Sequence, residues 1–291
     1  MWPLFDLEKQ YVKNPHIKRQ EVQELHQWLR EQPHIPQLLE HEVLLFFHAC
    51  EYQLEYCKQV IDKHYTFRSH TEDFFGNMDM ESPKLMLAQN TIAITPLQNL
   101  TPEGYGILMG KLVDTEPSKY IFADGLKLIF TIQDMWLQSH DLIPGFVIII
   151  DTSGTTFSHM ASVSLMQLKK LVYYLQETIP SRLIGIHFVN ATPIMEKIMN
   201  LVNIFLKKEL RKFIFVHSSL DSLYKHVPRH ILPQEYGGDD LPITELAVFF
   251  VENTYKNFHK HRLDIMEYNQ SRRVNEKLRP KKESKGFFGI W

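Results

Sequence analysis

The chain has 291 residues, of which 44% are hydrophobic, and its formal net charge is −2 at pH 7. That length and composition suffice for one large domain or two smaller ones with a sizeable core. The nearly neutral charge argues against nucleic acid as a partner, so any attraction to anions must be local. The N-terminus lacks the pattern of a signal peptide, and no segment approaches the eighteen apolar residues of a membrane span. We therefore expect a cytoplasmic protein.

The first 75 residues read as an all-helical unit. Apolar spacing predicts a helix that ends before Pro33 and Pro36, because proline cannot continue a helix. A second helical pattern runs over residues 38–69. We expect these helices to form a small layer, residues 1–75, that packs on something larger.

Two cysteines, Cys50 and Cys57, fall seven residues apart within that second helical pattern. Residues two turns apart on one helix have Cα atoms roughly 10 Å from each other, which is too far for a disulfide. The sequence thus predicts two buried free thiols, as is typical of a reducing compartment.

From about residue 88 the apolar pattern changes to short strand-like runs that alternate with helical ones. The predicted strands lie at residues 90–97, 105–113, 144–151, 183–190 and 211–217, with helical patterns at 124–142, 161–180 and 192–206. Strands that alternate with helices of ten or more residues indicate βαβ units and an open, mostly parallel sheet. We assign residues 76–250 to this α/β region.

Residues 251–291 form a C-terminal region that begins as a helix and becomes polar and basic. Its last residues combine lysines with Phe287, Phe288 and Trp291, a mixture suited to a membrane interface. A disordered, solvated tail is the alternative interpretation.

The segment 192–212 is the most informative one. Thr192 can cap a helix, and Pro193 suits its first turn. Apolar residues over 194–206 fill an arc of roughly 160° on the helix surface, and a group of basic residues follows. An ordinary amphipathic helix over a sheet, with cations near its C-terminus, explains the same pattern, so periodicity alone leaves both interpretations open.

The sequence offers little support for catalysis. Asp151, Ser153, Ser158 and His159 lie close together along the chain, but the nucleophile elbow of hydrolases is missing. The glycine-rich run 104–110 leads into a strand, whereas a nucleotide-binding loop opens a helix. The histidine spacings do not match a zinc helix. We expect no enzyme, no cofactor and no metal site.

Four segments resemble, in the expected order, the CRAL-TRIO lipid-binding family. They are residues 44–68, 144–159, 179–193 and 227–240, and the resemblance extends over about residues 20–250. It implies an N-terminal helical bundle followed by a domain whose mixed, mostly parallel sheet is flanked by helices and encloses a lipid pocket. Alpha-tocopherol transfer protein, cellular retinaldehyde-binding protein and their insect homologues are the relatives we expect.

The resemblance also implies which residues bind ligands, with the segment from Pro193 to Leu206 as a movable gate helix over the pocket. The implied pocket residues are Phe146, Ile148, Ile150, Val163, Leu171, Tyr174, Leu175, Ile179, Leu183, Ile186, Ile194, Ile198 and Val202. Some members hold phosphatidylinositol phosphates on basic residues beside the gate, which here are Arg182, Lys207, Lys208, Arg211 and Lys212. This basic match is partial, because Ile184 replaces a second basic residue.

The function implied by the family is that of an intracellular carrier of a small hydrophobic lipid of the tocopherol, retinoid or carotenoid type. The gate would open at membranes during transient contact with an anionic surface. The alternative function is that of a phosphoinositide-binding adaptor in membrane trafficking. We expect a monomer that is cytoplasmic and peripheral to membranes, with no nucleic acid as a partner.

Overall fold

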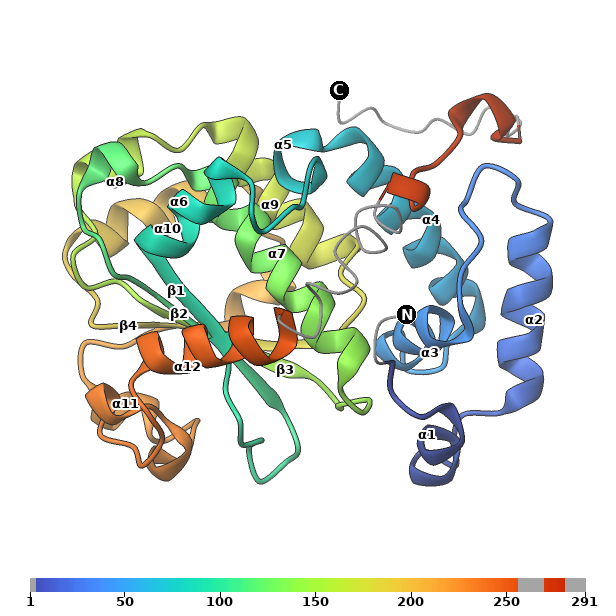
Figure 1. Cartoon of the computed structure of the whole chain (residues 1–291), viewed down its shortest axis with the longest axis horizontal. Coiled ribbons are helices and arrows are strands. Elements are labelled where there is room, and N and C mark those ends of the chain that lie inside the picture. Colours follow the sequence, from blue (N-terminus) through green and yellow to red (C-terminus); the bar gives the residue numbers. More distant parts are fainter. Residues whose placement is uncertain (1–3, 256–269, 281–291) are drawn as a thin grey trace.

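The computed structural model describes residues 4–255 and 270–280. Figure 1 shows the N-terminal helices gathered on one side of the molecule and a sheet with its own helices on the other. The predicted arrangement of a helical unit followed by an α/β domain is therefore confirmed.

The N-terminal unit consists of short helices. They are α1 (Leu7–Lys13), α2 (Arg19–Arg30), α3 (Glu40–Ala49), α4 (Leu54–His70) and α5 (Glu72–Phe75). The single helix predicted over residues 38–69 is wrong, because Glu51 and Tyr52 take φ angles of 53° and 61° between α3 and α4. A right-handed helix cannot pass through two residues of positive φ.

This break changes the argument about the two cysteines. Cys50 caps α3 whereas Cys57 lies in α4, so the distance expected along one continuous helix does not apply to them. Both thiols are free and buried. A hydrogen bond with Cys50, together with burial, raises the pKa of the Cys57 thiol, which keeps it protonated and unreactive.

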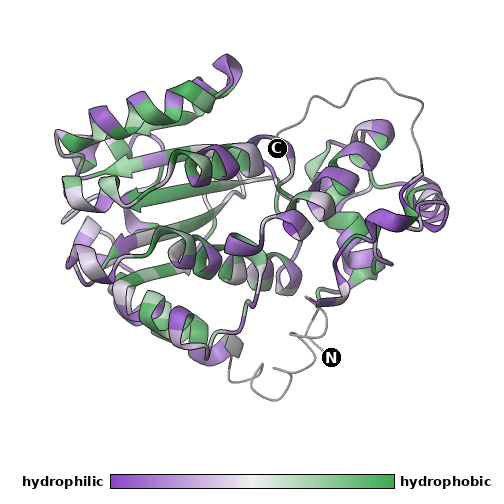
Figure 2. Ribbon diagram, turned by 90° about the horizontal axis from the view of Figure 1, so that it is seen from above, coloured by the Kyte–Doolittle hydropathy of each residue, from purple (hydrophilic) through white to green (hydrophobic). Residues whose placement is uncertain are grey.

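Five strands form one mixed sheet in the order β1-β2-β3-β4-β5. The strands are β1 (Ile92–Pro96), β2 (Gly106–Leu112), β3 (Phe146–Asp151), β4 (Leu183–Val189) and β5 (Ile214–Val216). The first two strands are antiparallel, and all later neighbours are parallel. Figure 2 shows that the strands are hydrophobic along most of their length, as expected of a sheet covered on both faces. The predicted mostly parallel sheet is confirmed.

Three helices connect the parallel strands: α7 (Phe122–Ser139), α9 (Leu165–Glu177) and α10 (Ile194–Phe205). Each crossover moves one strand further in the same direction, and such connections are right-handed. The three helices therefore lie over the same face of the sheet.

The remaining helices are shorter. They are α6 (Pro83–Thr91), which the sequence analysis missed, α8 (Phe157–Ala161), α11 (Leu220–Leu223) and α12 (Ile243–Phe250). Turns of 3₁₀-helix occur at η1 (Pro117–Lys119), η2 (Lys208–Phe213), η3 (Arg229–Ile231), η4 (Gln234–Tyr236) and η6 (Glu276–Leu278), and η5 (Val251–Tyr255) is a π-helix.

The two faces of the sheet are used differently. Side chains alternate along a strand, so Ile107 of β2 and Ile149 of β3 point to the face opposite α7, α9 and α10. On that face they pack in one cluster with Leu223 of α11 and Leu246 of α12. The face toward the three crossover helices is the one that forms the site described below.

An aromatic cluster joins the N-terminal unit to the crossover helices. The ring of Phe75 stacks on Phe130 of α7 at 5.0 Å between centroids, and Phe130 lies 4.6 Å from Tyr174 of α9. Beside this cluster, the Arg68 guanidinium donates two hydrogen bonds to the Asp134 carboxylate, at 3.1 and 2.7 Å. The N-terminal helices thus hold α7 and α9 from the side that faces away from the sheet.

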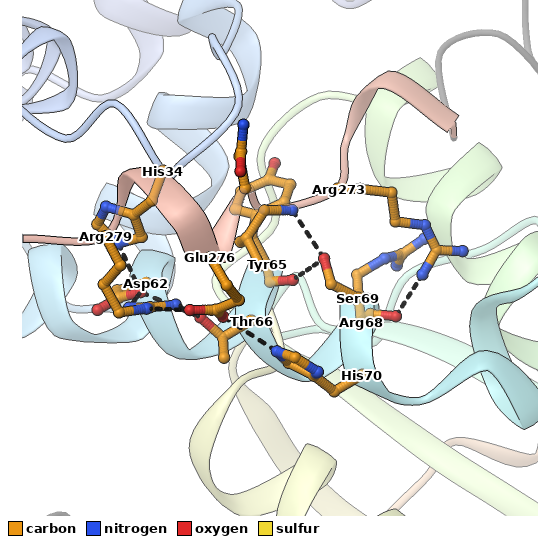
Figure 3. A network of polar contacts seen from close by, with 12 residues as sticks. His34, Asp62, Tyr65, Thr66, Arg68, Ser69, His70, Arg273, Glu276 and Arg279 are labelled. Atoms are coloured by element: carbon orange, nitrogen blue, oxygen red, sulfur yellow. Dashed lines mark hydrogen bonds and ion pairs between the residues drawn. The ribbon is translucent and has the colours of Figure 1, made fainter.

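The C-terminal segment, residues 270–280, lies against α3 and α4 (Figures 1 and 3). Arg272 donates to both carboxylate oxygens of Glu42, at 3.0 and 2.9 Å. Arg273 donates to the backbone carbonyl of Arg68, and Arg279 donates to Asp62 at 2.8 Å. The aromatic residues predicted for the end of the chain, Phe287, Phe288 and Trp291, lie outside the described residues.

We predict that Asp134→Ala lowers the free energy of unfolding by about 3 kcal/mol, because it leaves the Arg68 guanidinium buried without its charge partner. The control is Glu8→Ala, which removes an exposed pair with Arg19 and should change stability little. Urea unfolding followed by circular dichroism measures both variants. Equal losses would contradict the role given to the buried pair.

Candidate functional site

A cavity of about 490 Å³ lies between the sheet and helices α7, α9 and α10. Its floor consists of strand residues whose side chains point to the face that α7, α9 and α10 cover. Among them are Leu108, Ile148, Ile150, Ile186 and Phe188. Cavities of about 300–1,000 Å³ are typical of small-molecule sites. The lining is mostly apolar, which favours a hydrophobic ligand.

Each crossover helix contributes one apolar stripe to the cavity wall. Leu168, Leu171 and Leu175 of α9 recur at helical spacing and line the cavity. Residues Met195, Ile198, Leu201 and Val202 give α10 a stripe of the same kind. The apolar arc predicted for this helix therefore covers open space as well as protein.

The N-terminal unit also reaches the cavity. Cys50 at the end of α3, and Tyr56 and Val60 of α4, contribute to its lining. The sequence analysis missed these residues, because only the docking of one unit on the other brings them to the sheet domain.

Ten of the thirteen implied pocket residues lie in the cavity wall: Ile148, Ile150, Val163, Leu171, Leu175, Ile179, Leu183, Ile186, Ile198 and Val202. The other three do not line it. Phe146 packs against Trp136, at 6.4 Å between ring centroids, and Tyr174 turns toward Phe130 and the N-terminal helices. Ile194 begins α10, and the buried Met195 beside it lines the cavity instead.

The two ends of α10 are held differently. The predicted capping role of Thr192 is wrong, because Pro193 occupies the cap position and the buried Thr192 hydroxyl has no partner among the described residues. At the other end, the backbone N–H of Lys207 donates to the Gln176 side chain of α9 at 2.8 Å, and the Lys207 ammonium pairs with Glu177. The end of α10 is thus tied to α9, while its start lacks a cap.

Asp151 fixes the edge of the sheet from which α10 leaves. Its carboxylate accepts hydrogen bonds from Ser153, from the Asn190 side chain at 3.0 Å and from the Tyr236 hydroxyl at 2.7 Å. Burial alone would raise the pKa of Asp151, but these hydrogen bonds outweigh it and hold the pKa below its usual value. Asp151 is therefore a charged structural anchor between β3, the residue after β4 and the segment that precedes α12.

The groups weighed as catalytic do not form a relay within the described part of the chain. Ser153 donates to Asp151, whereas His159 accepts a hydrogen bond from the Thr156 backbone on its Nδ1. In residues 4–255 and 270–280, no set of histidine, cysteine and acidic side chains suits a metal ion. The helices of that same part of the chain are too short or too polar to cross a bilayer.

The basic residues implied as a headgroup site fall into two places. Lys208, Arg211 and Lys212 are exposed on η2, directly after the end of α10. Arg182 instead pairs with Glu51 at 3.0 Å and contributes to the cavity wall. The structure thus forms an exposed basic turn beside α10 from most of these residues, but uses Arg182 to bridge the two units.

Comparison with known proteins agrees with this architecture. Clavesin-2 of Mus musculus is 27% identical over 277 residues, which cover 92% of this chain and 84% of that protein. The alpha-tocopherol transfer protein-like protein of Homo sapiens is 27% identical over 230 residues, covering 78% of this chain and 67% of its own. The crystal structure of Sfh5 shares the fold, with a TM-score of 0.54 at 13% identity, over 87% of this chain and 99% of that one.

Two family models match the chain. The Pinta-like, UBA domain matches residues 14–85, which contain α2 to α5. The CRAL/TRIO domain matches residues 92–238, which contain all five strands and the cavity floor. Since this second match spans half of the sequence and agrees with the four resembling segments, the chain belongs to the CRAL/TRIO domain family.

Proposed function

We propose that the protein carries a small hydrophobic lipid in the cavity beneath α10. The proposal rests on that cavity, about 490 Å³ of mostly apolar space that the protein's own side chains do not fill. A lipid gains roughly 0.8 kcal/mol per buried CH₂ group, so one of about ten to twenty carbons is held firmly. Its loss into water is correspondingly slow, and a carrier therefore needs a way to open.

Helix α10 is the element we assign to opening. Its apolar stripe faces the cavity, so an open state exposes that stripe, and a membrane surface offers it apolar surroundings. The basic turn on η2 adds attraction to an anionic leaflet, at about 1 kcal/mol per lysine or arginine near the surface. The closed and open states need differ by only a few kcal/mol for a membrane to shift the balance.

The ligand class that we propose is a tocopherol, retinoid or carotenoid type of lipid. One relative bears a name that refers to tocopherol transfer, and the mostly apolar lining of the cavity suits a hydrophobic molecule of this kind. In this proposal the protein is a monomer in the cytosol that visits membranes transiently. It makes and breaks no covalent bond and is therefore not an enzyme.

A phosphoinositide-binding trafficking adaptor is the second candidate function. Lys208, Arg211 and Lys212 favour it, because three exposed cations on one short turn suit a phosphorylated headgroup. Leu210 and Phe213 of the same turn line the cavity, so headgroup binding there would be coupled to the cavity.

Native mass spectrometry of the protein purified from its own tissue distinguishes the two functions. A neutral isoprenoid lipid bound at one per chain supports the carrier. A phosphoinositide as the sole bound lipid supports the adaptor. Protein that carries no lipid, and takes up none from vesicles, contradicts both.

We predict that Ile198→Gln weakens lipid retention by about tenfold, because it places an amide in the apolar wall without a partner. The matched control is Ile204→Gln on the same helix, whose side chain is 66% exposed and should not affect binding in solution. Titration with the fluorescent hydrocarbon diphenylhexatriene measures both. Equal losses for the two variants would place the ligand elsewhere.

The double variant Lys208→Glu, Lys212→Glu should bind anionic vesicles at least about thirtyfold more weakly, since each lysine contributes about 1 kcal/mol. Lys18→Glu, Lys84→Glu changes the net charge equally at two exposed sites outside η2 and serves as the control. Co-sedimentation with vesicles containing phosphatidylserine, at two salt concentrations, gives the comparison. If both doubles lose binding alike, net charge rather than the η2 turn drives the contact.

A further inference from the structure

Three histidines meet at the edge of the sheet beside β5. His187 lies on β4, His217 directly follows β5, and His226 follows α11. The rings of His187 and His217 are parallel at 5.1 Å between centroids, and the His226 ring lies 5.1 and 5.7 Å from them. Ile186 and Phe188, on either side of His187, line the cavity, so the three rings lie on the opposite face of the sheet. Together they are named the histidine cluster.

The hydrogen bonds of the cluster fix where its protons lie. The Ser222 hydroxyl donates to the Ser219 carbonyl at 2.8 Å, so its oxygen accepts the bond from the His217 Nδ1, also at 2.8 Å. The Nδ1 of His217 therefore carries the proton of that neutral ring, and its Nε2 accepts from the Nδ1 of His187 at 2.9 Å. Every bond in this chain has one donor and one acceptor only while both rings are neutral.

The surroundings of the cluster offer no opposite charge. The ring of Phe215 on β5 stacks on His187 at 4.6 Å and lies 4.5 Å from His226. Strands β4 and β5 contain no acidic residue. Asp221 and Lys225, on the segment after β5, are exposed, and neither forms an ion pair within the described part of the chain. An imidazolium in the buried part of the cluster would therefore lack a charge partner.

The cluster is accordingly neutral at pH 7. Burial, followed by the neighbouring His217 and His226, lowers the pKa of His187 to about 3. Burial and then His226 also lower the pKa of His217. Both rings are buried, whereas His226 is exposed and connects the cluster to solvent. If both buried rings were charged, two N–H groups would face each other where one hydrogen bond now joins them.

The backbone of His217 holds the segment that leads into α10. Its N–H donates to the carbonyl of Phe188 at 2.8 Å, and its carbonyl accepts from the N–H of Ala191 at 3.2 Å. Ala191 lies between the end of β4 and the start of α10, directly after Asn190, whose φ angle is 52°. The start of α10 has no cap hydrogen bond. This uncapped start is thus attached to the sheet partly through a residue whose ring belongs to the histidine cluster.

We propose that the histidine cluster is a proton-sensitive hinge of α10, which takes up protons in mild acid, lets His217 move and releases the start of the helix. This inference rests on the opening of α10 proposed above and adds a condition that favours the open state. An anionic membrane provides this condition, because its negative surface potential concentrates protons as well as basic side chains.

Protons favour the open state because a histidine that leaves the cluster regains its usual pKa near 6.5. At about pH 5.5 His187 binds almost no protons in the closed cluster, whereas a freed histidine is mostly protonated. Lowering the pH from about 7.5 to about 5.5 therefore raises the open population about tenfold for each freed histidine. Well above pH 7 the histidines are neutral in both states, and the effect is lost.

Hydrogen exchange of the full chain, followed by mass spectrometry at these two pH values and corrected for intrinsic rates, tests the hinge. In the wild type, the protection of residues 189–196 should fall about tenfold or more at the lower pH, while that of β2 and β3 changes little. The double variant His187→Asn, His217→Gln keeps an amide donor and an amide acceptor near the two nitrogens that now bond, but neither side chain titrates. It should lose the response.

Two further variants complete the comparison. His187→Asn alone leaves His217 to titrate and should weaken the response by about tenfold, so it decides the question if the double variant does not fold. His230→Asn removes an exposed histidine outside the cluster and should leave the response unchanged. The functional readout is the rate at which bound diphenylhexatriene passes to neutral phosphatidylcholine vesicles. This rate should rise about tenfold at the lower pH in the wild type, but not in the double variant.

The outcomes separate the hinge from the carrier function. A wild type that binds no diphenylhexatriene at about pH 7.5 contradicts the carrier function, whereas the exchange measurement still decides the hinge. Equal protection of residues 189–196 at both pH values, or a loss of protection that spreads over the whole sheet, overturns the hinge. A full pH response in the double variant, or in His187→Asn alone, also overturns it, because other groups then cause the response.

Discussion

The cavity depends on the packing that holds α7 and α9 away from the sheet. Both helices have apolar stripes on the cavity side, and at about 24 cal/mol per Å³ an unfilled volume of 490 Å³ corresponds to on the order of 10 kcal/mol of missing contacts. Collapse onto the sheet would recover part of this. The aromatic cluster around Phe75 and Phe130 and the Arg68–Asp134 pair bind the outer sides of the same helices. By holding α7 and α9, the N-terminal unit thus helps to keep the cavity open.

If α10 opens as proposed, its differently held ends give that movement a direction. Its start has no cap hydrogen bond, whereas its end is tied to α9 through Gln176 and Glu177. An opening that pivots about the end keeps those bonds, while one that pivots about the start breaks them. The exposed basic turn on η2 follows the tied end directly, so in the proposed opening electrostatic attraction would act beside the pivot and leave the uncapped start to move.

Most of the sheet domain could be predicted from the sequence. Buried parallel strands appear as short unbroken apolar runs, whereas amphipathic helices repeat their apolar residues every three or four positions. The break at Glu51 and Tyr52 could not be predicted. Both residues have positive φ angles, but neither is a glycine, so no residue type in the sequence indicates the break. Phe146 and Tyr174 have the same sequence spacing as residues that line the cavity. In the structure, however, Phe146 packs against Trp136 and Tyr174 packs against Phe130. Apolar spacing along the chain does not reveal such contacts.

The binding of residues 270–280 to α3 and α4 can form only late in protein synthesis, after the rest of the described chain has been made. Glu42 and Arg272 are 230 residues apart, and at about 5–20 residues per second the ribosome needs roughly 10–50 s to make the intervening chain. The nascent N-terminal helices spend that interval without three of the arginines that later bind them. Until translation is almost complete, Glu42 and Asp62 have only the partners that lie within the N-terminal unit, such as Tyr65 and Thr66. The last step in building the wall of the cavity therefore comes after the cavity floor has been made.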